Sequence, residues 1–135
     1  MKYVQIPDVP LPVSRIVLGA SGSRFSSGGE IDDVMQSALA CGINAVDTAR
    51  EYGKSEDAIG NWLRAGGQWD QIVIISKCCH PTMAFISRVN EQAAVDDLKR
   101  SLELLFTDRI AVYLLHRHND RVPVGRIVDF LNRFY

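Results

Sequence analysis

The sequence predicts an α/β fold built on a parallel sheet, and two observations support this fold class. Apolar runs rich in β-branched residues recur four times, at residues 15–18, 44–46, 72–75 and 110–115. Each run is continuous rather than alternating, which is typical of strands buried on both faces of a parallel sheet. Helical patterns lie between the runs at a spacing of about 30 to 40 residues, as in right-handed βαβ units.

A short hairpin is predicted ahead of the first run. Residues 3–6 and 11–13 are two short apolar stretches, and Asp8-Val9-Pro10 between them supplies residues that favour a turn.

The first helix is predicted between the first and second strands. Four apolar residues recur at i, i+3, i+4 and i+7 and so share one helix face. They are Ile31, Val34, Met35 and Ala38. Gly42 follows at the place where a left-handed residue caps a helix.

The second helix is predicted to begin at Ser55, a good N-cap residue, followed by Glu56 and Asp57 in an acidic first turn. Gly66 and Gly67 predict its end. Its apolar positions are Ile59, Trp62 and Leu63.

The third helix is expected to have one apolar stripe and one solvated charged face. The stripe consists of Val95, Leu98, Leu102 and Leu105, and the charged face of Asp96, Asp97, Lys99 and Arg100. Pro123 opens a last helix, in which Ile127, Phe130 or Leu131, and Phe134 keep helical spacing.

Composition and charge exclude several classes of protein. A chain with 47% hydrophobic and 23% charged residues is not expected to be disordered. Fifteen Lys and Arg residues against sixteen Asp and Glu give a formal net charge of −1, so no basic field is available for nucleic acid or an anionic membrane. No run approaches the roughly 18 apolar residues of a membrane span, and no leader is recognised. We therefore expect a cytoplasmic protein whose partners are small molecules or proteins.

Four side chains suited to carbonyl chemistry stand at or after the ends of three successive predicted strands. They are Asp47, Tyr52, Lys77 and His116. The carboxyl ends of parallel strands meet at one edge of a sheet, which is where the active sites of barrel enzymes lie. Reduction of a carbonyl requires a proton donor at its oxygen and nearby positive charge. A phenol can supply the proton when an ammonium group stabilises the phenolate that remains.

The stretch from Asp47 to Gly53 reads Asp-Thr-Ala-Arg-Glu-Tyr-Gly. Together with Ser76-Lys77 and Leu114-Leu115-His116, it resembles the signature of the aldo-keto reductase family. The resemblance covers essentially the whole chain and implies the N-terminal half of a (β/α)8 TIM barrel, with the hairpin covering its bottom. A complete barrel needs about 250 residues, so residues 1–135 are expected to form a single partial domain.

The resemblance also implies an activity, the NAD(P)H-dependent reduction of an aldehyde or ketone to an alcohol. It implies Tyr52 as the proton donor, Lys77 as the group that tunes it, and Asp47 as the salt-bridge partner that orients Lys77. His116 would donate a hydrogen bond to the substrate carbonyl.

For the cofactor, the resemblance implies NADPH, with NADH as the alternative. Gly19, Ala20, Ser21 and Asp47 would touch the nicotinamide and ribose side, and most other contacts would come from the second half of the barrel. We therefore expect the isolated chain to bind cofactor weakly and to show no turnover. The glycines of residues 19–29 do not form a dinucleotide fingerprint and are expected to mark a flexible loop.

Two alternatives stay open. The first is a non-catalytic half-barrel, a binding or regulatory module or a truncation product, that self-associates. The long apolar edge of the fourth strand favours this, and its partner would be a second copy in a homodimer or a missing C-terminal half.

The second alternative is a metal-dependent hydrolase. Cys78, Cys79 and His80 could approach His116 and His118 in a ligand set that suits zinc. The spacing disfavours it, because adjacent cysteines on a strand point to opposite faces. A redox-sensitive thiol pair is a further reading, and otherwise Cys78 and Cys79 are small side chains that line the third-strand loop. Cys41 is expected to be buried packing on the first helix.

Overall fold

The computed structural model describes residues 1–66 and 68–134, and it contains a two-stranded hairpin and a four-stranded parallel sheet. The hairpin strands are β1 (Tyr3–Val4) and β2 (Val13–Ser14), and the sheet strands, which pair in sequence order, are β3 (Val17–Gly19), β4 (Ala45–Asp47), β5 (Val73–Cys78) and β6 (Val112–Leu115). The predicted parallel sheet and the predicted hairpin are both confirmed.

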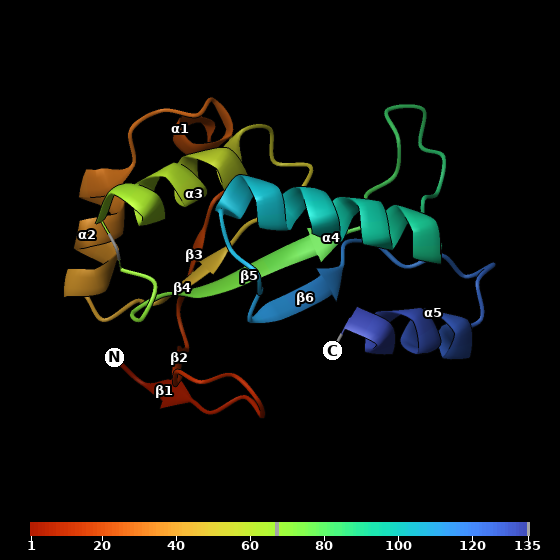
Figure 1. The fold of residues 1–135 in the computed structure, drawn as a ribbon, viewed down its shortest axis with the longest axis horizontal. Coiled ribbons are helices and arrows are strands. Elements are labelled where there is room, and N and C mark those ends of the chain that lie inside the picture. Colours follow the sequence, from red (N-terminus) through yellow and green to blue (C-terminus); the bar gives the residue numbers. More distant parts are fainter. Residues whose placement is uncertain (67, 135) are drawn as a thin grey trace.

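Five α-helices are described, and α3 and α4 run along one face of the sheet (Figure 1). They are α1 (Ser23–Ser26), α2 (Asp32–Ala40), α3 (Ser55–Gly66), α4 (Glu91–Leu105) and α5 (Val124–Leu131), and a 3-10 turn (Asn132–Phe134) follows α5. The predicted last helix is confirmed, with Ile127 and Phe130 buried. None of the helices in the described ranges is both long enough and apolar enough to cross a lipid bilayer.

Each strand of the sheet begins later in the chain than predicted. The strand expected at 44–46 begins at Ala45. The preceding Asn44 binds the hairpin: its Oδ1 accepts from the Ser14 backbone N–H at 2.9 Å, and its own N–H donates to Ser14 Oγ at 3.1 Å. Strand β5 runs further than predicted and ends at Cys78, because it pairs with β6 as far as Leu115. Lys77 therefore lies inside a strand rather than beyond one.

The prediction that all four strands are buried on both faces is wrong for β3 and β6. Val17 in β3 is 39% exposed, and Leu114 in β6 is 43% exposed. Both strands are edges of the sheet, so each has a neighbour on one side only. Beneath the first residues of β4 and β5, the hairpin packs Val9 and Val13 against Ala45 and Val73, which places the hairpin at the end where the strands begin.

The main core lies between the sheet, helices α2 and α3, and the end of α4. Its fully buried side chains include Met35, Ile59, Leu63, Leu105 and Val46. Helices α3 and α4 cross so closely at Gly60 that a Cβ there would lie 2.1 Å from the Leu104 carbonyl oxygen. A glycine is therefore required at this crossing.

The predicted end of α2 is confirmed at Gly42, which has φ +77°. The prediction for Cys41 is wrong, because this residue is exposed. It is the C-cap residue that follows the last residue of α2. The predicted end of α3 at Gly66 is confirmed, and Gly67 lies outside the described residues.

Two acidic residues are buried, and for Asp97 this contradicts the predicted solvated face of the third helix. Glu56 in the first turn of α3 accepts a hydrogen bond from Ser76. Asp97 on α4 accepts from the Cys79 backbone N–H at 2.8 Å and pairs with Arg88 at 2.8 Å. Both oxygens of Asp97 have a partner, whereas Glu56 bonds through Oε1 alone.

The loop after β3 differs from the expected flexible glycine loop. It contains the short helix α1, whose Phe25 is buried in the main core. This anchor holds the loop against α3 and, through Ser26, against the segment that carries Tyr52.

Candidate active site

Asp47 and Lys77 come together across two neighbouring strands. Asp47 is the last residue of β4 and pairs in register with Ile75 of β5, two residues before Lys77. Side chains two residues apart on a strand share a face, so Lys77 reaches back over the end of β4. Its Nζ lies 2.7 Å from Asp47 Oδ1.

The Lys77 ammonium contacts two further oxygen atoms. Besides its ion pair with Asp47, it donates to the Thr48 carbonyl oxygen at 2.8 Å and to Tyr52 Oη at 3.3 Å. The side chain is 14% exposed. An ammonium has no acceptor, so Tyr52 Oη must accept this bond, and its own O–H remains available to another acceptor.

Tyr52 is held by a turn that depends on a glycine. Its N–H donates to the Ala49 carbonyl at 3.0 Å, and Gly53 follows with φ +60°. A Cβ on Gly53 would lie 2.6 Å from the Ser26 carbonyl oxygen, which itself accepts from the Lys54 N–H. The loop that carries α1 therefore supports the Tyr52 turn directly.

His116 immediately follows β6 and completes the group. Its backbone N–H donates to the Cys78 carbonyl at 2.8 Å. Its ring lies edge-on to the ring of Tyr52, with 5.6 Å between the two centroids. Burial, together with the neighbouring charges of His80 and Lys77, lowers the pKa of His116 to about 4. The imidazole is therefore neutral at pH 7 and carries one N–H donor and one acceptor. A cleft of about 580 Å³ opens beside it, lined by Leu115, His116, Arg117 and His118.

The structure thus brings together all four of the side chains chosen from the sequence. It adds two groups that the sequence did not suggest for this site. The Thr48 backbone oxygen is one, and a backbone acceptor leaves no trace in residue identity. The His80 ring is the other, packed edge-on against His116 at 4.5 Å.

Gly19 and Ala20 lie beside Asp47, and Ser21 follows them in the chain. Gly19 ends β3 in register with Asp47, and the Ala20 N–H donates to the Asp47 carbonyl at 2.9 Å. Ala20 is buried, whereas Ser21 is exposed. A Cβ on Gly19 would meet no atom within 4 Å, so the space over this strand end is open next to the carboxylate of Asp47.

The expectation that Cys78 and Cys79 point to opposite faces is wrong. Cys79 has φ +62°, which breaks the strand alternation, and both side chains pack into one apolar cluster with Ile127 and Phe130. The thiol of Cys79 and burial raise the pKa of Cys78.

The side chains of the zinc alternative are only partly brought together. The rings of His80 and His116 are in contact, but His118 is exposed and pairs with Asp120 at 3.0 Å. Within residues 1–66 and 68–134, no three His, Cys, Asp or Glu side chains are arranged to hold a metal ion.

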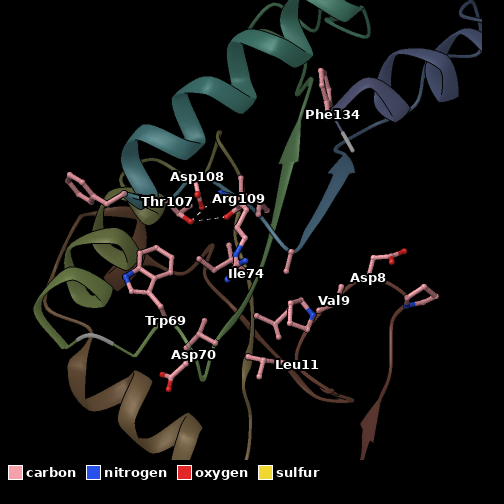
Figure 2. A pocket seen from close by; sticks show the side chains of 17 residues that line it. Asp8, Val9, Leu11, Trp69, Asp70, Ile74, Thr107, Asp108, Arg109 and Phe134 are labelled. Carbon is pink, nitrogen blue, oxygen red and sulfur yellow. Dashed lines mark hydrogen bonds between the residues drawn. The ribbon is translucent and has the colours of Figure 1, made fainter.

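A larger groove, of about 880 Å³, lies at the other end of the sheet (Figure 2). It opens between the hairpin turn, the first residues of β5 and the segment from Phe106 to Ala111. Val9, Leu11 and Trp69 form apolar parts of its lining, and Asp70 and Asp108 also line the groove. None of the four side chains of the candidate active site lines this groove. The groove is therefore separate from the candidate active site.

The sequence matches the family model described as "Aldo/keto reductase family" over residues 15–135. It is 28% identical over 144 aligned residues to the aldo-keto reductase YhdN of Bacillus subtilis, which covers 100% of this chain and 44% of YhdN. It is 30% identical over 132 residues to protein tas of Escherichia coli, which covers 86% of this chain and 38% of tas.

Two solved structures are similar across nearly the whole chain. PA4992 of Pseudomonas aeruginosa superposes with a TM-score of 0.79 at 28% identity, covering 97% of this chain and 54% of that one. The aldo-keto reductase AKR11C1 of Bacillus halodurans, in its holo form, gives a TM-score of 0.79 at 25% identity, and the match covers 98% of this chain and 46% of AKR11C1. The chain therefore spans about half the length of the proteins it matches, and the expected half of a (β/α)8 barrel is confirmed.

Proposed function

Because this chain belongs to the aldo/keto reductase family, we propose that it carries the proton-handling half of an NAD(P)H-dependent oxidoreductase that reduces an aldehyde or ketone to an alcohol. One observation supports this more than any other. The Lys77 ammonium forms an ion pair with the Asp47 carboxylate and at the same time donates a hydrogen bond to the Tyr52 hydroxyl.

In this proposal, Tyr52 is the general acid. Its hydroxyl accepts from Lys77 and is therefore free to donate its proton to a substrate carbonyl oxygen. As the oxygen gains negative charge, the proton moves to it, and the nearby ammonium of Lys77 stabilises the phenolate that remains. Asp47 holds Lys77 in place and balances its charge.

His116 is the second donor to the substrate. Since its pKa is lowered to about 4, the ring is a neutral imidazole across the ordinary working range of pH. A neutral ring can donate one N–H to the carbonyl oxygen without competing with Tyr52 to supply the proton. Its edge-on position beside Tyr52 lets both donors converge on one substrate atom.

Gly19, Ala20, Ser21 and Asp47 would hold the nicotinamide end of the cofactor, for which NADPH is the first choice and NADH the second. The open space over Gly19 beside Asp47 fits a flat ring. When bound, the nicotinamide supplies the hydride. The remaining cofactor contacts would come from the part of the barrel that the chain does not span, so the chain alone is expected to bind cofactor weakly.

A chimera tests this proposal. The chain is joined to the C-terminal half of YhdN, and NADPH oxidation is followed with a reactive aromatic aldehyde. We expect turnover in the chimera, none in the chain alone, and loss of turnover by at least about 100-fold in the Tyr52→Phe chimera. A folded chimera whose activity is unaffected by Tyr52→Phe would contradict the assignment of the acid.

A non-catalytic, self-associating half-barrel is the second candidate. The exposed edges β3 and β6, which carry the partly exposed Val17 and Leu114, favour it. Both edges run in the same direction, so a second copy related by a two-fold axis along the barrel axis would pair β6 with β3 in parallel at both seams. Light scattering would show a dimer of the 15.0 kDa chain, whereas a monomer at high concentration would exclude this arrangement.

A further inference from the structure

Glu56 is a buried carboxyl group that has no part in the chemistry proposed above. It lies in the first turn of α3 and is 2% exposed. Its Oε1 accepts from Ser76 Oγ at 2.6 Å, and its Oε2 is buried without a hydrogen-bond partner among the described residues. Burial raises the pKa of Glu56, and the Ser76 hydrogen bond, with smaller effects of Ser101 and Arg50, offsets this only in part.

The groups around Glu56 do not compensate the negative charge that an ionised Glu56 would carry. The charged groups that act on it are Arg50, ahead of α3, and Asp97, on α4, and these act in opposite directions. The Ser101 hydroxyl on α4 is also buried near Glu56 and lowers its pKa, less than Ser76 does. Neither this hydroxyl nor the buried hydroxyl of Tyr113 on β6 makes a well-formed hydrogen bond within the described residues. A carboxyl group at such a position costs stability relative to an apolar side chain of similar volume. What the carboxyl group offers that an apolar side chain cannot is the hydrogen bond to Ser76.

The bond joins the two segments that carry Tyr52 and Lys77. Ser76 directly precedes Lys77 in β5, and successive side chains on a strand point to opposite faces. Lys77 therefore faces Tyr52, while Ser76 faces α3 from behind the sheet. Glu56 lies four residues after Tyr52, at the start of the helix into which the Tyr52 turn leads.

Other contacts at the start of α3 reach different strands. Ser55 Oγ donates to the Ala20 carbonyl at 2.8 Å and lies 3.0 Å from Thr48 Oγ1, which ties the helix to the segments that follow β3 and β4. Among the described residues, Glu56 and Ser76 make the one side-chain hydrogen bond between α3 and β5. The Lys77–Tyr52 bond is 3.3 Å long, at the weak end of the usual range, so a small shift of α3 along β5 would break it.

We propose that Glu56 is a positioning residue, which fixes Tyr52 relative to Lys77 by binding the start of α3 to Ser76 on the strand that carries Lys77. The inference rests on the proposed roles of Tyr52 and Lys77 and deepens them. It requires only that the carboxyl oxygen accept from Ser76, so a glutamine should replace Glu56 and an apolar residue of similar volume should not.

The test is spectroscopic and needs no turnover. Lys77 Nζ lies 4.7 Å from the centroid of the Tyr52 ring, so the neighbouring ε-methylene protons of Lys77 experience the ring current of the phenol. Their proton shift is measured by NMR in the whole chain, and Tyr52→Leu defines the value without the ring. We expect Glu56→Gln to keep the ring-current shift, and Glu56→Leu and Ser76→Ala to lose most of it while the amide spectrum stays that of a folded chain.

Retention of the wild-type shift in folded Glu56→Leu and Ser76→Ala would overturn the proposal. Loss of the shift in Glu56→Gln as well as Glu56→Leu would also overturn it, because the Ser76 bond would then not be the cause. If Glu56→Leu does not fold, the ring-current shift is compared between Ser76→Ala and Glu56→Gln. Loss in Ser76→Ala alone supports the proposal, and retention in Ser76→Ala overturns it. Failure of the proposed function would show separately, as chimera activity that survives Tyr52→Phe.

Discussion

The Nζ of Lys77 lies over the ring of Tyr52, 4.7 Å from its centroid, and also donates to the hydroxyl of the same residue at 3.3 Å. The ammonium thus contacts the phenol through both its face and its oxygen. The Asp47 carboxylate and the Thr48 carbonyl fix the cation from the other side. One lysine therefore holds the end of β4 and the turn after it in a single arrangement.

Replacing Lys77 with Met should lower the free energy of unfolding by about 2 kcal/mol, because it leaves the partly buried Asp47 and the Thr48 carbonyl without their donor. The measurement is urea denaturation. Arg100→Met is the matched control, because Arg100 and Glu103 form an exposed pair on α4 and should contribute less than about 0.5 kcal/mol. Equal effects of the two substitutions would contradict the prediction.

Gly60→Ala should destabilise the chain by more than about 3 kcal/mol or prevent folding, because the new Cβ would lie 2.1 Å from the Leu104 carbonyl oxygen. The rigid backbones of α3 and α4 would have to separate. Gly125→Ala in the first turn of α5 is the control, since a Cβ there meets nothing within 4 Å, and it should be neutral or slightly stabilising. Thermal unfolding followed by circular dichroism compares the two variants, and a stable Gly60→Ala chain would show that the crossing can relax.

His116 should titrate with a pKa of about 4, well below the unperturbed value of about 6.5. The unfolded chain then binds the proton more tightly, so stability should fall as the pH drops from about 6.5 towards 4. The NMR shift of the imidazole C–H reports the pKa directly. His80→Ala should raise the pKa of His116, because it removes a neighbouring positive charge. A pKa of His116 near 6.5 in the wild-type chain would contradict the argument from burial.

Glu56 should make the chain less stable as the pH rises. Its pKa is raised in the folded state, so its contribution is fully present below the unfolded value of about 4.3 and is lost as the pH rises through the folded value. Glu56→Gln cannot titrate and should lack this loss. Urea unfolding of both proteins across the acid to neutral range should show the stability of Glu56→Gln rising relative to the wild type. A constant difference across that range would mean that the folded and unfolded pKa values of Glu56 are equal.

The strands and the four clustered side chains were predictable from the sequence for one physical reason. Continuous β-branched runs require burial on a sheet, and the carboxyl ends of parallel strands meet at one edge. Asp47, Lys77 and His116 therefore had to lie near one another once the strand order was right. Their distances, and the role of the Thr48 carbonyl, depend on backbone direction, which residue identity does not specify.

The buried acids were not predictable, because a carboxylate on a helix normally faces water. Glu56 and Asp97 are buried because their partners, Ser76 and the Cys79 backbone N–H, come from elements 18 or more residues away. The left-handed Cys79 is a similar case, since nothing in two adjacent cysteines indicates that the second will reverse the strand alternation. The exposure of β3 and β6 follows from how many strands the sheet has, which the composition of a single strand does not reveal.

The strand order of the sheet also has a consequence for how the chain folds. Each strand from β3 to β5 pairs with the strand that follows it in sequence, so every pairing closes after one or two helices rather than across the whole domain. Contacts of short sequence separation form quickly and cost less loop-closure entropy. During synthesis, each new strand can therefore add to an edge that already exists. The pair Asp47–Lys77 can form as soon as β5 has joined β4, so the arrangement around Tyr52 can be built from the N-terminal side, one strand at a time.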